Sequence, residues 1–406
     1  MSKSTPTTDI PIPIPKDFLA AGVHCGLKRD PRKPDLTLVV SRRPATAVGV
    51  FTQNVVCGAP VTLNRRRTPS EKIRVVAVNS GNANACTGRR GLEDAERMAA
   101  MVAAACGAEE DQALVMSTGI IGEFLPLDKI ERGIKAAADK LGRDDHSLLD
   151  AARGMMTTDT VPKLAGRAIT LGGREIRIMG MAKGAAMIGP NMATMLGLIV
   201  TDAPLRPAAA QTLLKAAVDE SFNCISVEGH TSTSDTVLLL ANGAAGGEPL
   251  AGDDLAAFGR ALSEVCVELA RAIPADGEGA SHLISIEVAG CADRRSALQI
   301  AKTVANSALV KTAIAGADPN WGRIVSAAGY AGVPFDPAGV SLHLNGLLLY
   351  QGGTPVAFDR AAVSASIRDR RETSIRLKLS EGDAEVRFWT TDLTAEYIRL
   401  NADYHT

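Results

Sequence analysis

Hydrophobic and polar positions switch between strand-like and helical spacing along the whole chain. The run KIRVVAVN (72–79) has the nearly continuous apolar character of a buried strand. The next run, GLEDAERMAAMVAAACG (91–107), places its apolar side chains on one helical face. This alternation predicts a mixed α/β fold.

The same alternation continues through the rest of the first half. A strand at 112–117 is expected to end in Thr118 and Gly119, and Pro126 is expected to begin a second helix, because proline is favoured in the first helical turn. A predicted hairpin at 167–182 turns at a Gly-Gly pair and leads into Lys183.

The second half predicts several more elements, without a fixed repeat or a low-complexity linker. They are helices from Pro207 to about Phe222, at 253–273, near 295–315 and near 360–370, strands at 224–228 and 236–241, and hairpins turning at 345–346 and at 381–383.

The run KGAAMIGPNMATML (183–196) carries the most distinctive candidate chemistry. Thr194 follows a Gly-Pro-Asn turn and precedes an apolar strand. A threonine hydroxyl is a weak nucleophile, but an N-terminal threonine can use its own α-amine as the base. The α-amine pKa of about 7.7–8.0 suits that task. For any threonine taken alone, a buried strand position is the favoured interpretation.

Composition narrows the function classes. Lys and Arg (44) nearly cancel Asp and Glu (45), so no overall charge draws the protein to nucleic acid or to a membrane surface. Hydrophobic residues make up 46% of the chain and aromatic residues only 3%, which predicts a globular enzyme with an aliphatic core.

The seven cysteines are odd in number, widely spread and without a CxxC pair, so we expect reduced thiols, a cytoplasmic location and no metal site. Residues 1–15, with alternating prolines, predict a flexible leader and neither a signal peptide nor a membrane span.

An ordered set of motifs covers nearly the whole chain: VAVNSGNANACTG, STGIIG, MTTDTVPK, KGAAMIGPNMATML, SFNCISVEGHTSTSDT, ADGEGA, VANSALVKTAIAGADPNWGRI and YIRLNADYHT. This set resembles the ornithine acetyltransferase family, also called the bifunctional arginine biosynthesis family (glutamate N-acetyltransferases). One departure is Ala186, where many family members have glycine.

The resemblance implies a layered αββα sandwich shared with self-processing aminopeptidases. It also implies a precursor that cleaves itself between Ala193 and Thr194. The products would be an α chain (1–193) and a β chain (194–406), two of each forming the active enzyme.

By the same resemblance, Thr194 takes an acetyl group from N-acetylornithine and passes it to glutamate in a ping-pong exchange. One amide is exchanged for another, so no cofactor is expected. Acetyl-CoA remains possible as a second acetyl donor in a bifunctional enzyme.

The resemblance also assigns roles to individual residues. Thr118 and Gly119 match the pair that stabilises the oxyanion. Five further positions match substrate-binding residues: Thr157, Lys183, Glu278, Asn401 and Thr406. From the residues alone, a strand-ending turn, solvated surface charges and a frayed terminus explain the same positions.

The sequence offers weaker support for other candidate site residues. The NSGNAN run (79–84) is explained by turn structure, and a triad of His230, Asp235 and Ser232 or Ser234 is disfavoured because its members crowd into one short loop. Two competing functions stay open: an N-acetylamino-acid hydrolase or aminopeptidase of the same fold, and a binding protein without catalysis. Glutamate-dependent release of ornithine distinguishes the transferase from the hydrolase.

Overall fold

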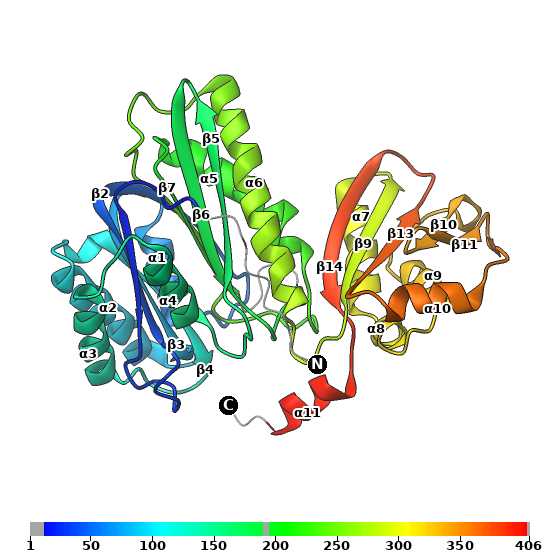
Figure 1. The fold of residues 1–406 in the computed structure, drawn as a ribbon, viewed down its shortest axis with the longest axis horizontal. Coiled ribbons are helices and arrows are strands. Elements are labelled where there is room, and N and C mark those ends of the chain that lie inside the picture. Colours follow the sequence, from blue (N-terminus) through cyan, green and yellow to red (C-terminus); the bar gives the residue numbers. More distant parts are fainter. Residues whose placement is uncertain (1–11, 190–194, 404–406) are drawn as a thin grey trace.

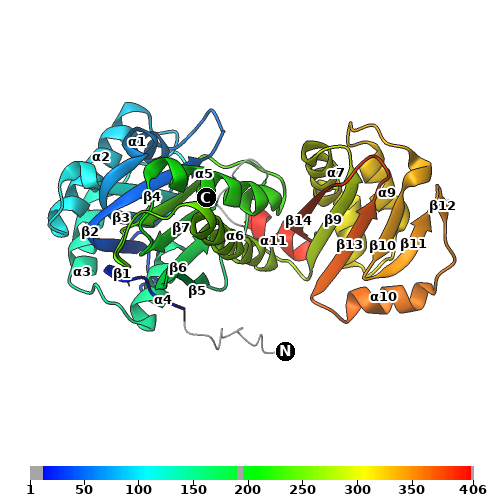
Figure 2. The same cartoon turned by 90° about the horizontal axis from the view of Figure 1, so that it is seen from above.

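The structure is a computed structural model that describes residues 12–189 and 195–403. It has a larger lobe built around an eight-stranded sheet and a smaller lobe built around a six-stranded sheet (Figure 1). Seen from above, the two lobes lie side by side, and the C-terminal helix returns to the region between them (Figure 2).

The eight-stranded sheet of the larger lobe has the order β4-β3-β2-β8-β7-β6-β5, and β1 also pairs with β2. Its strands are β1 (Phe18–Val23), β2 (Leu36–Phe51), β3 (Ser70–Asn82), β4 (Ala113–Ile120), β5 (Lys163–Leu171), β6 (Arg174–Lys183), β7 (Leu196–Thr201) and β8 (Thr236–Ala241). The helices of this lobe are α1 (Ala59–Arg67), α2 (Gly88–Ala105), α3 (Leu127–Ala138), α4 (Asp145–Met155), α5 (Pro207–Glu220) and α6 (Gly252–Ala275).

Strand β2 joins two layers of this sheet. Its first part pairs with β1 and β3, and its last part, Thr46–Phe51, pairs with β8. The register of β2 against β3 shifts between Val40 and Ala45, where Arg42, Arg43 and Pro44 are exposed. Such an irregularity bends a strand and strengthens its twist, so one continuous sheet supplies both β layers.

The alternation of side chains along each strand sorts the core into three parts. On β3, Val76 and Val78 join a core cluster that also contains Leu198 and Val200 of β7, so the two β layers pack face to face. On the other face of β3, Val75 packs with residues of α2 and α3.

The outer face of the second layer is covered in the same way. Ile199 of β7 and Leu239 of β8 belong to the cluster that contains Leu214 of α5 and Leu262 of α6. The order of layers is therefore helices, sheet, sheet, helices, which confirms the predicted αββα sandwich.

The smaller lobe has a mixed sheet in the order β12-β11-β10-β13-β9-β14. Its elements are β9 (Leu283–Cys291), α7 (Arg294–Asn306), α8 (Ala308–Ala315), α9 (Trp321–Gly329), β10 (Ser341–Leu344), β11 (Leu347–Gln351), β12 (Thr354–Pro355), α10 (Arg360–Arg368), β13 (Glu372–Lys378) and β14 (Ala384–Thr391), followed by α11 (Ala395–Asp403). The sequence patterns did not separate this lobe from the sandwich.

Most predicted elements are present, including the strand at 72–79, the helix at 91–107 and the hairpins turning at 172–173 and 345–346. Two predictions are wrong. Strands β13 and β14 do not form a hairpin at 381–383: they pair with opposite edges of β9, and the connection crosses the end of β9. The predicted strand at 224–228 begins with a 3₁₀ turn, Phe222–Cys224, and continues as an irregular segment.

Residues 12–15, at the end of the predicted leader, lie against the sandwich, where Ile12 and Ile14 pack on the inter-sheet core. Within 12–189 and 195–403, no helix is long and apolar enough to cross a membrane.

Candidate active site

The first feature of the candidate site is the buried contact between Lys183 and Thr118. Lys183 ends β6 and Thr118 lies near the end of β4, and each residue is 1% exposed. The Lys183 Nζ atom donates a hydrogen bond to Thr118 Oγ1 at 3.2 Å. The predicted oxyanion residue and the predicted substrate-binding lysine therefore meet, although they are 65 positions apart.

Buried charges surround this contact. Burial lowers the pKa of Lys183, opposed by the negative charges of Asp159, Asp235 and Glu278. The pKa of Asp159 responds in the opposite way: burial raises it, but the charges of Lys163 and Lys183 outweigh burial and hold it below its usual range. Lys183 is thus a poorly hydrated cation, which suits the binding of a substrate carboxylate.

Asp159 organises the residues next to Lys183. Its carboxylate accepts hydrogen bonds from the backbone N–H of Gly184 (2.7 Å) and from that of Thr157 (3.0 Å), and it forms an ion pair with Lys163 (2.7 Å). Thr157, a predicted substrate-binding residue, is therefore held beside the Lys183 region by Asp159.

The loop after α6 joins the same network. Asp276 pairs with Lys163 at 2.8 Å and accepts hydrogen bonds from the backbone of Thr160 and Val161. Two residues later, the backbone N–H of Glu278 donates to the carbonyl of Ala185 at 2.9 Å. Glu278 is thereby fixed against the segment that leads to the predicted cut.

The C-terminal helix closes on Glu278. The side-chain amide of Asn401, on α11, donates to Glu278 Oε2 at 2.8 Å. Two predicted substrate-binding residues thus meet through a contact that spans 123 positions. The side chain of Asn401 is exposed. Its role in substrate binding stays a prediction.

Gly119 cannot be replaced without moving the backbone. Its φ is +133°, and a Cβ atom there would lie 2.3 Å from the carbonyl carbon of Gly81 and 2.5 Å from the backbone nitrogen of Asn82. The close approach of β3 and β4 at this point requires glycine. This requirement explains Gly119 structurally, whether or not its N–H also stabilises an oxyanion.

Ala193, Thr194 and Thr406 lie outside the described residues, but the residues next to the predicted cut are described. The backbone N–H of Met195 donates to Asp235 Oδ1 at 2.9 Å. On the other side, the backbone N–H of Ile188 donates to Glu228 Oε1 at 2.7 Å. The chain is therefore held on both flanks of residues 190–194.

Both flanking carboxyl groups are buried. Burial raises the pKa of Glu228 to about 7 and raises the pKa of Asp235 well above its usual range, although hydrogen bonds from backbone N–H groups oppose both shifts. Glu228 Oε2 and Asp235 Oδ2 have no hydrogen-bond partner within the described parts of the chain. Burial therefore favours the neutral form of both carboxyl groups.

The sequence analysis did not single out Asp159, Glu228, Lys163 or Asp276, and it disfavoured Asp235 as a member of a triad. All five residues do lie inside motif runs of the resemblance, which was the only available signal. Periodicity cannot reveal that a charged residue is buried when its burial depends on elements remote in sequence.

The Asn79, Asn82 and Asn84 side chains do form turn structure, as their composition indicates. Asn79 Nδ2 donates to the carbonyl of Asn82 at 2.8 Å, and Asn82 Oδ1 accepts from the N–H of Asn84 at 2.8 Å. They support the end of β3 next to Thr118.

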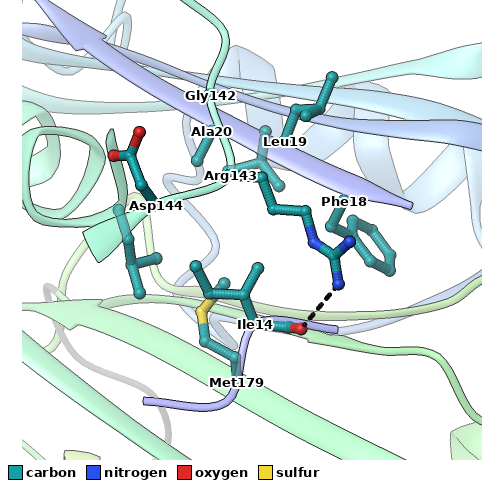
Figure 3. A pocket seen from close by; sticks show the side chains of 10 residues that line it. Ile14, Phe18, Leu19, Ala20, Gly142, Arg143, Asp144 and Met179 are labelled. Carbon is teal, nitrogen blue, oxygen red and sulfur yellow. Dashed lines mark hydrogen bonds between the residues drawn. The ribbon is translucent and has the colours of Figure 1, made fainter. Parts of the chain in front are cut away.

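A small hollow in the sandwich is separate from this network. Ile14, Phe18, Ala20 and Met179 line it, and Arg143 reaches across to the carbonyl of Ile14 (Figure 3). None of the candidate site residues lines this hollow. Among residues 12–189 and 195–403, no group of three or more His, Cys, Asp or Glu side chains has the geometry of a metal site.

The arrangement suits the binding of an amino-acid substrate. A buried cation faces a hydroxyl at the end of β4, and a carboxylate, Glu278, lies on the nearby loop. An amino-acid substrate carries a carboxylate and an ammonium group, which these two charges complement. The residue that follows Thr194 is fixed close by, since Asp235 lies near enough to Lys183 to affect its pKa.

Comparisons with known proteins agree across the chain. A profile described as the ArgJ family matches residues 19–406. The Arginine biosynthesis bifunctional protein ArgJ of Rhodopirellula baltica is 45% identical over 396 residues, which cover 97% of this chain and 96% of that protein. The protein of the same name from Symbiobacterium thermophilum is 44% identical, covering 97% and 98%.

A solved structure is also similar. The crystal structure of the Arginine biosynthesis bifunctional protein argJ from Bacillus halodurans matches with a TM-score of 0.50 and 38% identity. The match covers 51% of this chain but 98% of the solved chain. The solved polypeptide is therefore about half as long as this chain.

Proposed function

The chain belongs to the ArgJ family, and from this membership we propose how its residues carry out the reaction. The protein is an acetyltransferase of arginine biosynthesis. We propose that the acetyl group moves from N-acetylornithine to glutamate, through an acetyl ester on Thr194 that forms after self-cleavage. The buried contact between Lys183 and Thr118 is the observation that best supports these residues as the site of the proposed reaction.

Self-cleavage is the first step of the proposal. The Thr194 hydroxyl attacks the carbonyl carbon of Ala193, the C–N bond breaks, and the acyl group moves from nitrogen to oxygen. Water then hydrolyses the ester, leaving a carboxylate on Ala193 and a free α-amine on Thr194. The half-length of the solved relative supports a family in which the precursor becomes two chains.

Acetyl transfer uses the same hydroxyl. The Thr194 α-amine takes the hydroxyl proton while the oxygen attacks the acetyl carbon of N-acetylornithine, and the proton then goes to the departing amine of ornithine. Glutamate binds next, and its amine attacks the acetyl ester to give N-acetylglutamate and free Thr194. The Thr118 hydroxyl and the Gly119 N–H stabilise the charge on the acetyl oxygen in both halves of the cycle.

The surrounding charges select the substrate. Lys183 binds the substrate carboxylate, with Thr157 beside it, and Glu278 binds the ornithine ammonium. Asn401 holds Glu278 in place, and Thr406 completes the pocket from the C-terminal tail. The reaction as proposed needs no cofactor. Three further points stay predictions: the use of acetyl-CoA as a second acetyl donor, an assembly with two α and two β chains, and a cytoplasmic location.

Intact-mass spectrometry of the purified protein, before and after brief exposure to N-acetylornithine, tests the proposal. We expect two chains that meet between Ala193 and Thr194, with one acetyl group appearing on the β chain and leaving when glutamate is added. Loss of the acetyl group to water at the same rate without glutamate would indicate a hydrolase. A single uncut chain that never gains acetyl would overturn the mechanism.

A further inference from the structure

One loop contacts the chain on both sides of the predicted cut. We call residues 226–235 the clamp loop; it connects the 3₁₀ turn after α5 with β8. On the upstream side it contacts Ile188, and on the downstream side it contacts Met195. The intervening residues 189–194 thus run between two points that belong to the same short loop.

The upstream contact is made by several groups. The Ile188 carbonyl accepts hydrogen bonds from the N–H groups of Val227 (2.8 Å) and Gly229 (3.0 Å), and the Ile188 N–H donates to Glu228 Oε1 (2.7 Å). Gly189 approaches Gly229 so closely that a Cβ on Gly189 would lie 2.5 Å from the Gly229 carbonyl carbon. The backbones of the two segments are therefore in direct contact.

The downstream contact depends mainly on one side chain. Met195 N–H donates to Asp235 Oδ1 at 2.9 Å, and the Met195 carbonyl accepts from the N–H of Thr236 at 3.3 Å. Because Thr194 is joined directly to the Met195 nitrogen, this anchor lies one covalent bond beyond the nucleophilic residue.

The clamp loop is itself fixed from behind by both lobes. Lys311 of α8 donates to the carbonyl of Val227 at 2.6 Å, and Ser226 Oγ donates to Asn306 of α7 at 2.6 Å. In the larger lobe, Thr52 donates through its N–H to the carbonyl of Asp235 and through Oγ1 to that of Ser232. A loop held this way can restrict the segment that it contacts.

We propose that the clamp loop aligns the scissile segment for self-cleavage, and that Glu228 and Asp235 are its two positioning residues. This inference rests on the proposed self-cleavage before Thr194. Attack of a hydroxyl on the preceding carbonyl requires a rare backbone arrangement, and fixing both flanks removes most of the alternatives. The required property of each carboxyl group is an oxygen that accepts the backbone N–H, not a negative charge.

The burial of both groups supports this division of roles. One oxygen of each carboxyl group lacks a hydrogen-bond partner in the described parts of the chain. A neutral carboxylic acid in such a place still accepts a hydrogen bond through its carbonyl oxygen. Glutamine and asparagine imitate that neutral acid in shape and in acceptor.

Pulse-chase of newly synthesised full-length chains, followed by electrophoresis, measures the rate at which the 406-residue chain splits. We expect Glu228→Ala and Asp235→Ala each to slow splitting by at least about tenfold, because the anchor is lost. Glu228→Gln and Asp235→Asn should split within about threefold of the wild-type rate, because the acceptor is kept.

Asp202→Ala is the matched control. Asp202 is fully buried just after β7, at the opposite end of that strand from Met195, and it accepts backbone hydrogen bonds from Arg177 (2.8 Å) and Lys16 (3.0 Å). Its loss should destabilise the fold to a similar extent while splitting stays at the wild-type rate. Thermal unfolding in a Thr194→Ala background shows whether each variant folds.

The possible outcomes test the role of the clamp loop separately from the proposed function. Alanine variants that fold and split normally would overturn the clamp, and so would amide variants as slow as the alanine ones, since charge would then be the needed property. If one alanine variant does not fold, the variant on the other flank and both amide variants still decide. A wild-type chain that never splits would overturn the proposed function itself.

Discussion

At the residue scale, the Lys183–Thr118 contact joins two groups that sequence could only match by motif. The motif runs indicated that both residues belong to the site, but not that the lysine is buried and hydrogen-bonded to the threonine. That contact depends on β4 and β6 meeting through the packed inter-sheet core, which local patterns do not encode. The burial of Asp159 and Asp235 could not be predicted for the same reason.

Thr118→Val tests the oxyanion role, because valine keeps the shape and removes the hydroxyl. We expect the kcat of acetyl transfer to fall by about 10²–10³, the usual cost of one oxyanion donor. The matched control is Thr46→Val, which removes a buried hydroxyl that donates to Leu205 at 2.9 Å, outside the site. It should lose about 1 kcal/mol of stability and keep its activity; equal activity in both variants would remove Thr118 from the mechanism.

Glu228 makes stability depend on pH with a predictable sign. Its pKa rises from an ordinary 4.5 to about 7 on folding, mainly through burial. The folded chain therefore binds this proton more tightly than the unfolded chain, and Glu228 costs stability progressively as pH rises from 4.5 through 7. The side chain in Glu228→Gln cannot ionise, so that variant does not lose stability through ionisation at this position.

The test compares Thr194→Ala with Thr194→Ala/Glu228→Gln by urea unfolding, since an uncut chain cannot dissociate into two chains during the measurement. The stability of the double variant relative to the single variant should increase by about 2–3 kcal/mol between pH 5 and pH 8. A constant difference would mean that Glu228 does not have a raised pKa.

At the element scale, β2 and β13 show two features of the fold that the sequence pattern did not predict. The apolar run of β2 is interrupted by Arg42, Arg43 and Pro44, so its pattern does not predict one strand. In the structure, the strand bends at these residues and continues. The turn between β13 and β14 resembles a hairpin, but β9, whose residues pair with β13 residues about ninety positions later, lies between the two strands. Helices were predicted more reliably because one amphipathic face suffices.

Helix α11 has no buried residue, and its Asn401 side chain forms a hydrogen bond with Glu278 of the site. Deleting residues 401–406 should therefore leave the midpoint of thermal unfolding nearly unchanged, while the KM for N-acetylornithine rises by at least about tenfold through loss of the Asn401–Glu278 hydrogen bond. A chain ending at Asp403 separates the helix from the last three residues. Full activity of the shorter chain would show that the tail does not shape the pocket.

At the scale of the whole molecule, the predicted cut does not fall between domains. Along the chain it lies between β6 and β7, which are neighbouring strands of the eight-stranded sheet. In the predicted cleaved protein, β7 of the β chain would still pair with β6 of the α chain, and β8 of the β chain with β2 of the α chain. The apolar cores of the sandwich draw on both chains, so cutting one peptide bond does not release them.

Thr194→Ala should give a single uncut 406-residue chain without transfer activity, because both the nucleophile and the later base are lost. Electrophoresis and an ornithine-release assay check this. Normal splitting of the variant would place the nucleophile elsewhere.

The interleaving of β7 and β8 between strands of the other chain also changes the kinetic order of assembly. An uncut chain can form this sheet by a unimolecular reaction, whereas two separated chains must first collide. After denaturation, the Thr194→Ala chain should refold at a rate independent of concentration, and cleaved wild-type protein at a rate that rises with it. We therefore expect the sheet to form first, within one uncut chain, and the predicted cut to follow.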